Sequence, residues 1–349
     1  MTERRKSKEI AVGNIKIGGQ NPIAVQSMTF TKTSDADATV KQILSLERCG
    51  CDIVRFSVPD EESAKSIDYI KEHTHIPLVA DIHFNYKLAL TAIERGIDKI
   101  RINPGNIGAP ERIRAVADAC RRKGIPIRIG VNGGSLEKHI LAKYGAPTPE
   151  ALTESALYHV RLLEQFDFSD IVVSIKSSSV ADTVRANRLF AEQNDYPLHL
   201  GVTEAGTERM GVIKSSAGIG ALLIDGIGDT VRVSLTDECE KEVAAERDLL
   251  KSLGLRGGVN IVSCPTCART NIHVIDIANR LHSLLDGCDK NIKVAVMGCA
   301  VNGPGEAKDA DIGIAGGVGE ALLIKHGEIV GKIPEDRIIE ALLSEIEKL

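Results

Sequence analysis

The chain has 349 residues, of which 43% are hydrophobic and 26% charged, and its formal net charge is −5. This charge, the absence of tryptophan and an aromatic content of 3% argue against a protein that binds nucleic acid. No segment approaches the roughly 20 apolar residues that span a bilayer, and the charged beginning of the chain lacks the apolar stretch of a signal peptide. We therefore expect a cytoplasmic protein that does not bind membranes.

Short β-rich runs alternate with amphipathic helical runs over most of the chain, with Gly or Pro at many of the returns. The eight β-rich runs are residues 22–28, 51–58, 77–84, 98–104, 126–132, 170–177, 197–204 and 229–236. Eight evenly spaced β–α units predict an α/β fold, a (β/α)8 TIM-type barrel, in preference to an open doubly wound sheet. A small hairpin in residues 9–19 precedes the first strand, and we expect it to cover the barrel floor.

The pattern changes near Gly257 and Gly258, which suit a linker, so we expect a barrel domain in residues 1–254 and a smaller α/β domain in residues 255–349. The elements expected in the second domain are a helix in residues 274–285, a strand in 293–298, a hairpin in 321–333 and a final helix opened by Pro334. Ile339, Leu342, Leu343 and Ile346 lie on one face of that last helix.

Barrel enzymes carry their chemistry at the carboxyl ends of the strands, and several strands end here in alternating polar and apolar residues. The helices cover the apolar face, so the polar set points into the barrel mouth. This set contains the cations Arg55, Arg101, Arg128, Lys176 and Arg232, together with Asn103, Asn132 and Ser234. Five converging cations repel one another unless an anion joins them, and Arg binds phosphate oxygens in a planar, bidentate way. The pattern predicts a diphosphate site; the alternative is that each cation pairs with a carboxylate of a neighbouring strand.

The same mouth receives Asp81 and His83 after the third strand and Glu204 after the seventh. A carboxylate among cations can transfer a proton or balance charge, and for His83 a structural hydrogen bond is the alternative to acid–base chemistry. Glu204 shares strand parity with apolar residues, so a catalytic role requires that it lie beyond the regular part of the strand.

Three of the eight cysteines form a pattern typical of a metal or cluster site. Cys264 and Cys267 have the C-x2-C spacing, and Cys299 follows 32 residues after Cys267 in a glycine-rich segment. Zinc is the main alternative to an iron–sulfur cluster. Structural zinc commonly uses two close pairs of ligands, and the chain has no second C-x2-C. His273 or His326 would have to complete the set of zinc ligands. The chain lacks the CxxxCxxC triplet of radical-SAM enzymes and a complete GxGxxG nucleotide fingerprint.

These residues together resemble the bacterial 4-hydroxy-3-methylbut-2-enyl diphosphate synthases, iron–sulfur reductases of the methylerythritol phosphate route to isoprenoids. The motifs that carry the resemblance are VQSMT, VRFSVPD, ADIHF, KIRINPGNIG, IRIGVNGGSLE, SIKSS, GVTEAG, SCPTC and GCAVNGPGEA, which run nearly end to end. The resemblance implies that Cys264, Cys267, Cys299 and Glu306 bind a [4Fe–4S] cluster and that Glu204 is the proton donor. It also implies that Arg55, Arg101, Arg128, Lys176, Asn132 and Ser234 surround the diphosphate, to which we add Asp81, His83 and Asn103 as substrate-binding residues.

The implied reaction opens 2-C-methyl-D-erythritol 2,4-cyclodiphosphate and removes a hydroxyl group as water, with two electrons from flavodoxin or ferredoxin. The resemblance further implies a homodimer in which the cluster domain of one chain closes the barrel of the other. Two other functions remain open on the residues alone. One is a non-redox barrel enzyme, such as an aldolase that uses Lys176 as a Schiff base beside a structural zinc domain; the other is a non-catalytic phosphate-binding module with a zinc-bound interaction domain.

Overall fold

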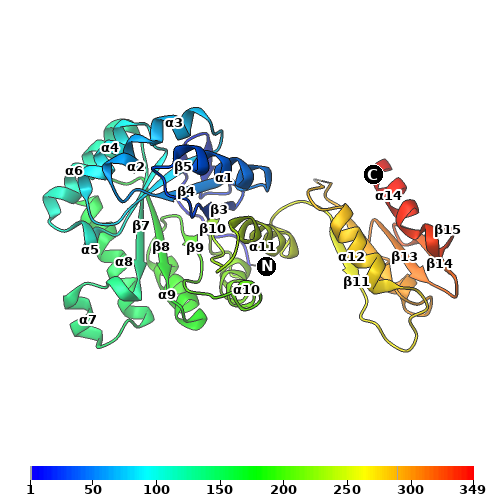
Figure 1. Ribbon diagram of the computed structural model, residues 1–349. Coiled ribbons are helices and arrows are strands. Elements are labelled where there is room, and N and C mark those ends of the chain that lie inside the picture. Colours follow the sequence, from blue (N-terminus) through cyan, green and yellow to red (C-terminus); the bar gives the residue numbers. More distant parts are fainter. Residues whose placement is uncertain (1, 289) are drawn as a thin grey trace. The chain divides into compact units, whose positions relative to one another are not determined.

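The computed structural model describes residues 2–288 and 290–349 and divides the chain into two compact units (Figure 1). The first unit ends at Leu253, and the second runs from Gly254 to Leu349. Among the described residues, no helix is both long enough and apolar enough to cross a membrane.

The first unit is a barrel of eight parallel strands surrounded by helices, so the predicted (β/α)8 fold is confirmed (Figure 1). The strands are β3 (Ala24–Met28), β4 (Ile53–Ser57), β5 (Leu78–Ile82), β6 (Lys99–Ile102), β7 (Ile127–Asn132), β8 (Ile171–Lys176), β9 (His199–Leu200) and β10 (Thr230–Val231). Their spatial order is β8-β7-β6-β5-β4-β3-β10-β9. A bridge between Val173 and Leu198 connects β8 with the segment that enters β9, which brings the two ends of the sheet together.

Several helices of this unit begin at a residue whose side chain accepts a hydrogen bond from the first turn of the helix. The helices are α1 (Ala36–Arg48), α2 (Glu61–Lys65), α3 (Ile67–Glu72), α4 (Tyr86–Glu94), α5 (Pro104–Ile107), α6 (Pro110–Lys123), α7 (Lys138–Tyr144), α8 (Pro149–Glu164), α9 (Val180–Gln193), α10 (Glu208–Ile224) and α11 (Cys239–Ser252). The side chains of Asp35, Asp60, Asn85 and Ser179 accept hydrogen bonds from the first turns of α1, α2, α4 and α9. Gly124, with φ +65°, ends α6 in the left-handed conformation that glycine adopts without strain.

Strands β9 and β10 are shorter than the eight-residue runs predicted for them. For β10 the reason lies in helix α11, whose acids bind the backbone that follows this strand. Val233 N donates to Glu246 Oε1 at 2.6 Å, and Leu235 N donates to Glu242 Oε1 at 2.9 Å. These N–H groups are therefore held by side chains instead of by a neighbouring strand.

A hairpin covers the amino-terminal end of the barrel. Strands β1 (Ile10–Val12) and β2 (Ile15–Ile17) pair antiparallel, as predicted. Their buried side chains join one apolar cluster with residues from four barrel strands, Ala24, Ile53, Val79 and Val172. The barrel floor is thus an apolar plug, while the carboxyl ends of the strands lie at the opposite end.

The second unit is a five-stranded sheet with the order β11-β12-β13-β14-β15. Its strands are β11 (Asn260–Ser263), β12 (Lys293–Met297), β13 (Ile312–Gly316), β14 (Glu320–Lys325) and β15 (Glu328–Pro334), and its helices are α12 (Val274–Leu284), α13 (Gly303–Glu306) and α14 (Ile338–Lys348). The first three strands are parallel, and β14 and β15 form the predicted antiparallel hairpin.

The last helix begins later than the sequence suggests. Pro334 ends β15, a short 3-10 turn follows, and α14 starts at Ile338. Leu342 and Ile346 are buried in the core of this unit, whereas Ile339 and Leu343 are only partly buried against it. The prediction of one apolar face is therefore confirmed, but the prediction that Pro334 opens the helix is wrong.

Candidate functional site

The polar residues of the barrel strands lie on the inner face, as the alternation predicts. The centre of this set is Asp81, which ends up between two arginines: its Oδ1 is 2.9 Å from Arg101 Nη1, and its Oδ2 is 3.6 Å from Arg55 Nε. Burial opposes the ionisation of Asp81, but the charges of Arg55 and Arg101 outweigh it and lower its pKa to about 2. Asp81 is thus a permanent anion that fixes two cations.

Arg128 differs from these two arginines because its charge is not balanced in the same way. Its side chain is 1% exposed, and its Nε and Nη2 have no hydrogen-bond partner among the described residues. Burial lowers its pKa, and repulsion from Arg55 and Arg101 adds to the effect. Pairing of every cation with a neighbouring carboxylate, the alternative to an anion site, therefore does not describe Arg128.

Two glycines on the inner face give the long cationic side chains room to lie across the barrel. A Cβ atom on Gly130 would lie 2.6 Å from Arg101 Nε, and a Cβ atom on Gly201 would lie 2.5 Å from Lys176 Nζ. Neither glycine has a positive φ, so space, not backbone conformation, is the reason for glycine at these positions. Burial and the charge of Arg232 lower the pKa of Lys176 well below its ordinary value.

Helix α11 supplies two buried acids that sequence reasoning missed. Glu242 lies 3.4 Å from Arg232 Nη2, so this fifth cation has a carboxylate partner. Glu246 is fully buried, and burial together with the charge of Glu242 raises its pKa well above the ordinary value. The available signal was the i,i+4 spacing of two acids on the same helical face as the apolar Val243 and Leu250.

The two predicted asparagines are connected by a serine. Asn103 Oδ1 accepts a hydrogen bond from Gly105 N at 3.0 Å, which caps α5, and Asn103 Nδ2 donates to Ser135 Oγ at 2.7 Å. Ser135 Oγ in turn donates to Asn132 Oδ1 at 2.9 Å. Ser135 was missed because it lies in a 3-10 turn after β7, where strand alternation gives no information.

The remaining predicted residues lie at the ends of strands or beyond them. Glu204 follows β9 by four residues, is exposed and has φ +53°, a left-handed conformation that is uncommon outside glycine. It therefore lies beyond the regular strand, which was the condition for a catalytic role. His83 is exposed directly after β5 and near enough to Asp81 to help lower its pKa. Ser234 is half-buried between the two backbone groups that α11 holds.

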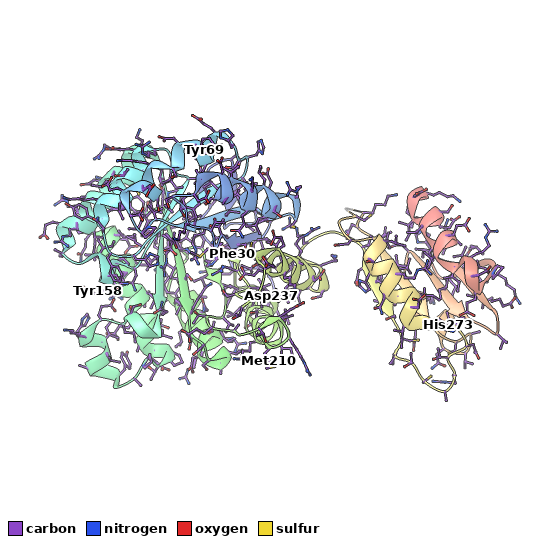
Figure 2. All side chains as sticks on the ribbon, in the orientation of Figure 1. Phe30, Tyr69, Tyr158, Met210, Asp237 and His273 are labelled. Carbon is purple, nitrogen blue, oxygen red and sulfur yellow. The ribbon has the colours of Figure 1, made fainter. Side chains whose placement is uncertain are left out.

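Exposed apolar side chains follow the same strand ends. Phe30 comes shortly after β3 and is 65% exposed, and Phe84 follows β5 and is 69% exposed. Met210, 48% exposed, lies in the first turn of α10, which follows β9; Phe30 and Met210 are labelled in Figure 2. Water-exposed aromatic side chains in the loops after barrel strands indicate a surface that another molecule covers.

The second unit holds the predicted cysteines in loops after neighbouring strands. Cys264 follows β11, and Cys299 follows β12, which pairs with β11. Gly298 N donates a hydrogen bond to Cys264 Sγ at 3.1 Å. Hydrogen bonds from the backbone and side chain of Arg269 lower the pKa of Cys267.

Backbone hydrogen bonds from Asn302 and Val301 lower the pKa of Cys299. Arg269 is the residue that sequence reasoning missed here. Its hydrogen bond to Cys267 raises its pKa, and the charges of Cys267, Cys299 and Glu306 add to this effect. Within the described part of the chain, no three His, Cys, Asp or Glu side chains already stand as a metal-binding group.

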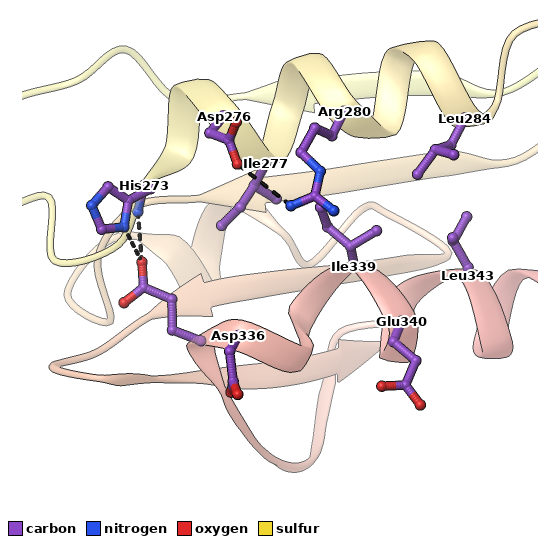
Figure 3. Close-up of a pocket in the computed structure, with 10 residues that line it drawn as sticks. His273, Asp276, Ile277, Arg280, Leu284, Asp336, Ile339, Glu340 and Leu343 are labelled. Atoms are coloured by element: carbon purple, nitrogen blue, oxygen red, sulfur yellow. Dashed lines mark hydrogen bonds and ion pairs between the residues drawn. The ribbon is translucent and has the colours of Figure 1, made fainter.

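A hollow between α12 and α14 is a separate feature of the second unit (Figure 3). It is lined by His273, Asp276, Ile277, Arg280, Leu284, Glu335, Asp336, Ile339, Glu340 and Leu343. His273 Nδ1 lies 2.7 Å from Glu335 Oε1, and Asp276 forms an i,i+4 ion pair with Arg280. The four predicted cluster ligands are not among the described residues of this lining, so the hollow is not the cysteine site.

The chain is similar to known proteins over nearly its whole length. Residues 7–247 match the family model of the GcpE TIM-barrel domain, and residues 260–348 match that of the GcpE protein C-terminal domain. A protein of Caldicellulosiruptor saccharolyticus named 4-hydroxy-3-methylbut-2-en-1-yl diphosphate synthase (flavodoxin) is 58% identical, over 98% of this chain and 99% of its own. A protein of Clostridium perfringens with the same name is 54% identical, over 99% of each chain.

Two solved structures share the fold over about seven tenths of the chain. Dihydropteroate synthase from Stenotrophomonas maltophilia covers 71% of this chain and 97% of its own, with a TM-score of 0.53 and 16% identity. The enzyme of that name from Xanthomonas albilineans covers 71% of this chain and 98% of its own, with a TM-score of 0.51 and 17% identity. At these identities the likeness concerns the fold and not the chemistry.

Proposed function

The chain belongs to the GcpE family, and from this premise we propose that it catalyses the reaction after which its relatives are named. The substrate is 2-C-methyl-D-erythritol 2,4-cyclodiphosphate, and the product is (E)-4-hydroxy-3-methylbut-2-enyl diphosphate. Two electrons and two protons enter, the ring opens, and one hydroxyl oxygen leaves as water. Flavodoxin or ferredoxin supplies the electrons. The names of the relatives include flavodoxin.

The observation that carries this proposal is the excess of buried positive charge inside the barrel. Asp81 balances Arg55 and Arg101 only in part, and two buried nitrogen atoms of Arg128 have no partner among the described residues. Burying an unpaired guanidinium is costly, so the arrangement is favourable mainly when an anion is bound. A diphosphate carries the charge and the oxygen atoms that this set requires.

The second unit suits a [4Fe–4S] cluster in its donor chemistry. Three thiols and one carboxylate, those of Cys264, Cys267, Cys299 and Glu306, would hold it, and the lowered pKa values of Cys267 and Cys299 favour the thiolate form that binds iron. Cluster irons bound by oxygen exchange ligands more readily than those bound by sulfur. When bound, the cluster would supply single electrons and a Lewis-acidic iron. We accordingly propose that residues 1–254 bind the substrate and residues 255–349 bind the cluster.

The residues of the barrel have separate roles in this proposal. The cations and the amides of Asn103 and Asn132 hold the diphosphate and so position the carbon skeleton. Glu204 donates the proton that the reaction consumes, and its left-handed backbone fixes it beyond β9, where its exposed carboxyl can meet a substrate in the mouth. His83 contacts the substrate beside Asp81.

We also propose that the protein is a homodimer in which a second copy covers the barrel mouth. The exposed Phe30, Phe84 and Met210 support this, because they are apolar side chains in segments that follow barrel strands, where polar residues would otherwise be expected around a phosphate site. Covering the mouth excludes water and strengthens every charge interaction inside.

The test is the metal content of protein purified without oxygen, followed by turnover. About four irons and four sulfides per chain, with visible absorption that dithionite bleaches, are expected. Cys299→Ser should lose the iron and the activity with reduced flavodoxin, whereas the matched control Cys288→Ser should keep both. One zinc and no colour would instead favour the aldolase-like or the phosphate-binding alternative.

A further inference from the structure

A buried pair of side chains, Glu137 and His159, connects helix α8 with the segment that follows strand β7. His159 Nε2 lies 2.5 Å from Glu137 Oε1, and the side chains of His159 and Glu137 are 2% and 11% exposed. His159 lies within α8, and Glu137 is the residue that precedes α7. Neither residue has a role in the proposed reaction so far.

The bond between these two side chains is the polar contact on which both depend. Among the described residues, Glu137 Oε2 and His159 Nδ1 have no hydrogen-bond partner. Burial opposes the ionisation of Glu137, but hydrogen bonds, chiefly the one with His159, outweigh it and lower the pKa of the carboxyl group. A hydrogen bond to an ionised acceptor is roughly twice as strong as one between neutral groups. The pair therefore attaches Glu137 firmly to α8.

One glycine separates this pair from the amide of Asn103. Gly105 belongs to α5, which follows β6, and its N–H donates to Asn103 Oδ1 at 3.0 Å. A Cβ atom on Gly105 would lie 3.0 Å from Glu137 Oε1 and 3.3 Å from Asn103 Oδ1. The same position is 3.7 Å from His159 Nε2. The pair thus packs against the backbone that holds the amide of Asn103.

The segment between β7 and α7 connects the pair with the second amide. It begins after Asn132, ends at Glu137, and carries Ser135, whose hydroxyl group joins the side chains of Asn132 and Asn103. Two consecutive glycines precede Ser135 and leave this segment many accessible backbone conformations. Fixing Glu137 therefore restricts where the hydroxyl group of Ser135, two residues earlier, can lie.

We propose that Glu137 and His159 are positioning residues for the diphosphate: they hold the segment after β7 against the segment after β6, and so keep the amides of Asn103 and Asn132 in the arrangement that binds the anion. Both act through these amides, because their own side chains are buried. That the anion is a diphosphate rests on the proposed function; the contacts of the pair do not. The alternative is a bond that only attaches α7 to α8.

The probe is inorganic pyrophosphate, titrated by calorimetry into the full chain. His159→Leu removes the ring nitrogens and keeps an apolar side chain in the buried position, and we expect pyrophosphate affinity to fall roughly tenfold, the scale of one lost hydrogen bond. His159→Gln should restore most of the affinity, because its amide N–H can donate to Glu137 from about the position of Nε2. This rescue would show that the hydrogen bond, and not the ring, is required.

Thr153→Val is the matched control on the same helix. The hydroxyl group of Thr153 is buried and donates to Ala186 O in α9 at 3.1 Å. Both Thr153→Val and His159→Leu should lower the thermal midpoint, because each breaks a buried hydrogen bond. Only His159→Leu should lower the affinity for pyrophosphate. Equal affinities of these two variants would overturn the inference and leave the pair as an attachment of α7 to α8.

A double-mutant cycle tests whether the pair acts through the amides. In a chain that carries Asn103→Ala and Asn132→Ala, the further change His159→Leu should lower pyrophosphate affinity less than about twofold. A loss as large as that in the unaltered chain would overturn the inference. If His159→Leu does not fold, Glu137→Gln, which keeps the size of the side chain and removes its charge, decides by the same cycle.

Hydrogen exchange followed by mass spectrometry reads the two segments without any ligand. The N–H of Gly105 is held by Asn103 Oδ1, and the N–H of Leu141 is held by Glu137 O at 2.9 Å. Both should exchange faster in His159→Leu than in Thr153→Val, and unchanged exchange would overturn the inference.

The proposed function can fail separately from the inference. If the unaltered chain does not bind pyrophosphate, the proposed diphosphate site is contradicted, and hydrogen exchange decides whether the pair holds the two segments. Pyrophosphate binding requires neither the cluster nor an electron donor. The expected pattern of affinities without turnover of the cyclodiphosphate would thus contradict the proposed reaction alone.

Discussion

Asp81→Asn is the substitution for which the structure gives the clearest magnitude. The variant removes the carboxylate between Arg55 and Arg101 and keeps the size of the side chain. The folded-state pKa of Asp81 is about 2, against ~3.9 for an unfolded Asp, and a difference of about two pKa units corresponds to ~2.6 kcal/mol at pH 7. We expect the free energy of unfolding to fall by about 3 kcal/mol, within the range known for removing one partner of a buried ion pair.

The pH dependence follows from the direction of this shift. Because folding lowers the pKa of Asp81, its stabilising contribution is complete above about pH 4 and is lost as the pH falls towards about 2. The difference in unfolding free energy between the unaltered chain and Asp81→Asn should therefore be constant from about pH 8 to about pH 5 and should shrink below about pH 4. A bound anion can partly replace the lost carboxylate beside Arg55 and Arg101, so saturating pyrophosphate should stabilise the variant more than the unaltered chain.

Tyrosine fluorescence during urea unfolding is the suitable assay. The chain has no tryptophan, and all five tyrosines precede residue 254, so the signal reports the barrel unit alone. Glu208→Gln is the control, because Glu208 forms an exposed ion pair with Lys241 that should contribute less than about 1 kcal/mol. The reasoning would be refuted if Asp81→Asn were as stable as the control variant at pH 7. It would also be refuted if the difference in unfolding free energy between Asp81→Asn and the unaltered chain were the same at pH 3 as at pH 7.

Two further substitutions test the mouth of the barrel. Gly130→Ala places a methyl group 2.6 Å from Arg101 Nε, so it should weaken pyrophosphate binding about tenfold by calorimetry. The control Gly134→Ala, whose new methyl group has nothing closer than 3.7 Å, should leave the affinity unchanged. Equal pyrophosphate affinities of the two variants would exclude a role for the space at Gly130. Glu204→Gln should lower kcat at least a hundredfold, the low end for lost general acid catalysis, and leave pyrophosphate affinity unchanged; a raised Kd with normal kcat would make Glu204 a binding residue instead.

The barrel and its inner charges were predictable because strands have a period of two. Alternation places Arg55, Arg101 and Arg128 on the inner face whatever the details of packing. The depth of each side chain was not predictable, so the sequence alone does not tell whether Arg128 lies at the mouth or deeper inside the barrel.

Contributions from other elements were also beyond the reach of strand alternation. Glu242 and Glu246 enter the site from a helix, and by binding the backbone after β10 they shorten the very strand that the sequence suggested. The C-x2-C spacing indicates Cys264 and Cys267 as ligands. Glu306 ends the short helix α13, in a stretch whose glycines and proline look like a loop in the sequence, so an acid there carries no such signal and only the resemblance points to it.

The apolar plug formed by β1 and β2 makes the barrel a blind-ended chamber. A molecule that enters at the carboxyl ends of the strands has no second exit through the floor, so substrate, product and the released water share one opening. Product and substrate must then compete for the free protein, and any copy of the chain that covers the opening has to withdraw once in every catalytic cycle. With a second copy over the mouth, as proposed, the closed floor would make the rate of turnover depend on the opening of the mouth, at the far end of the barrel from the hairpin.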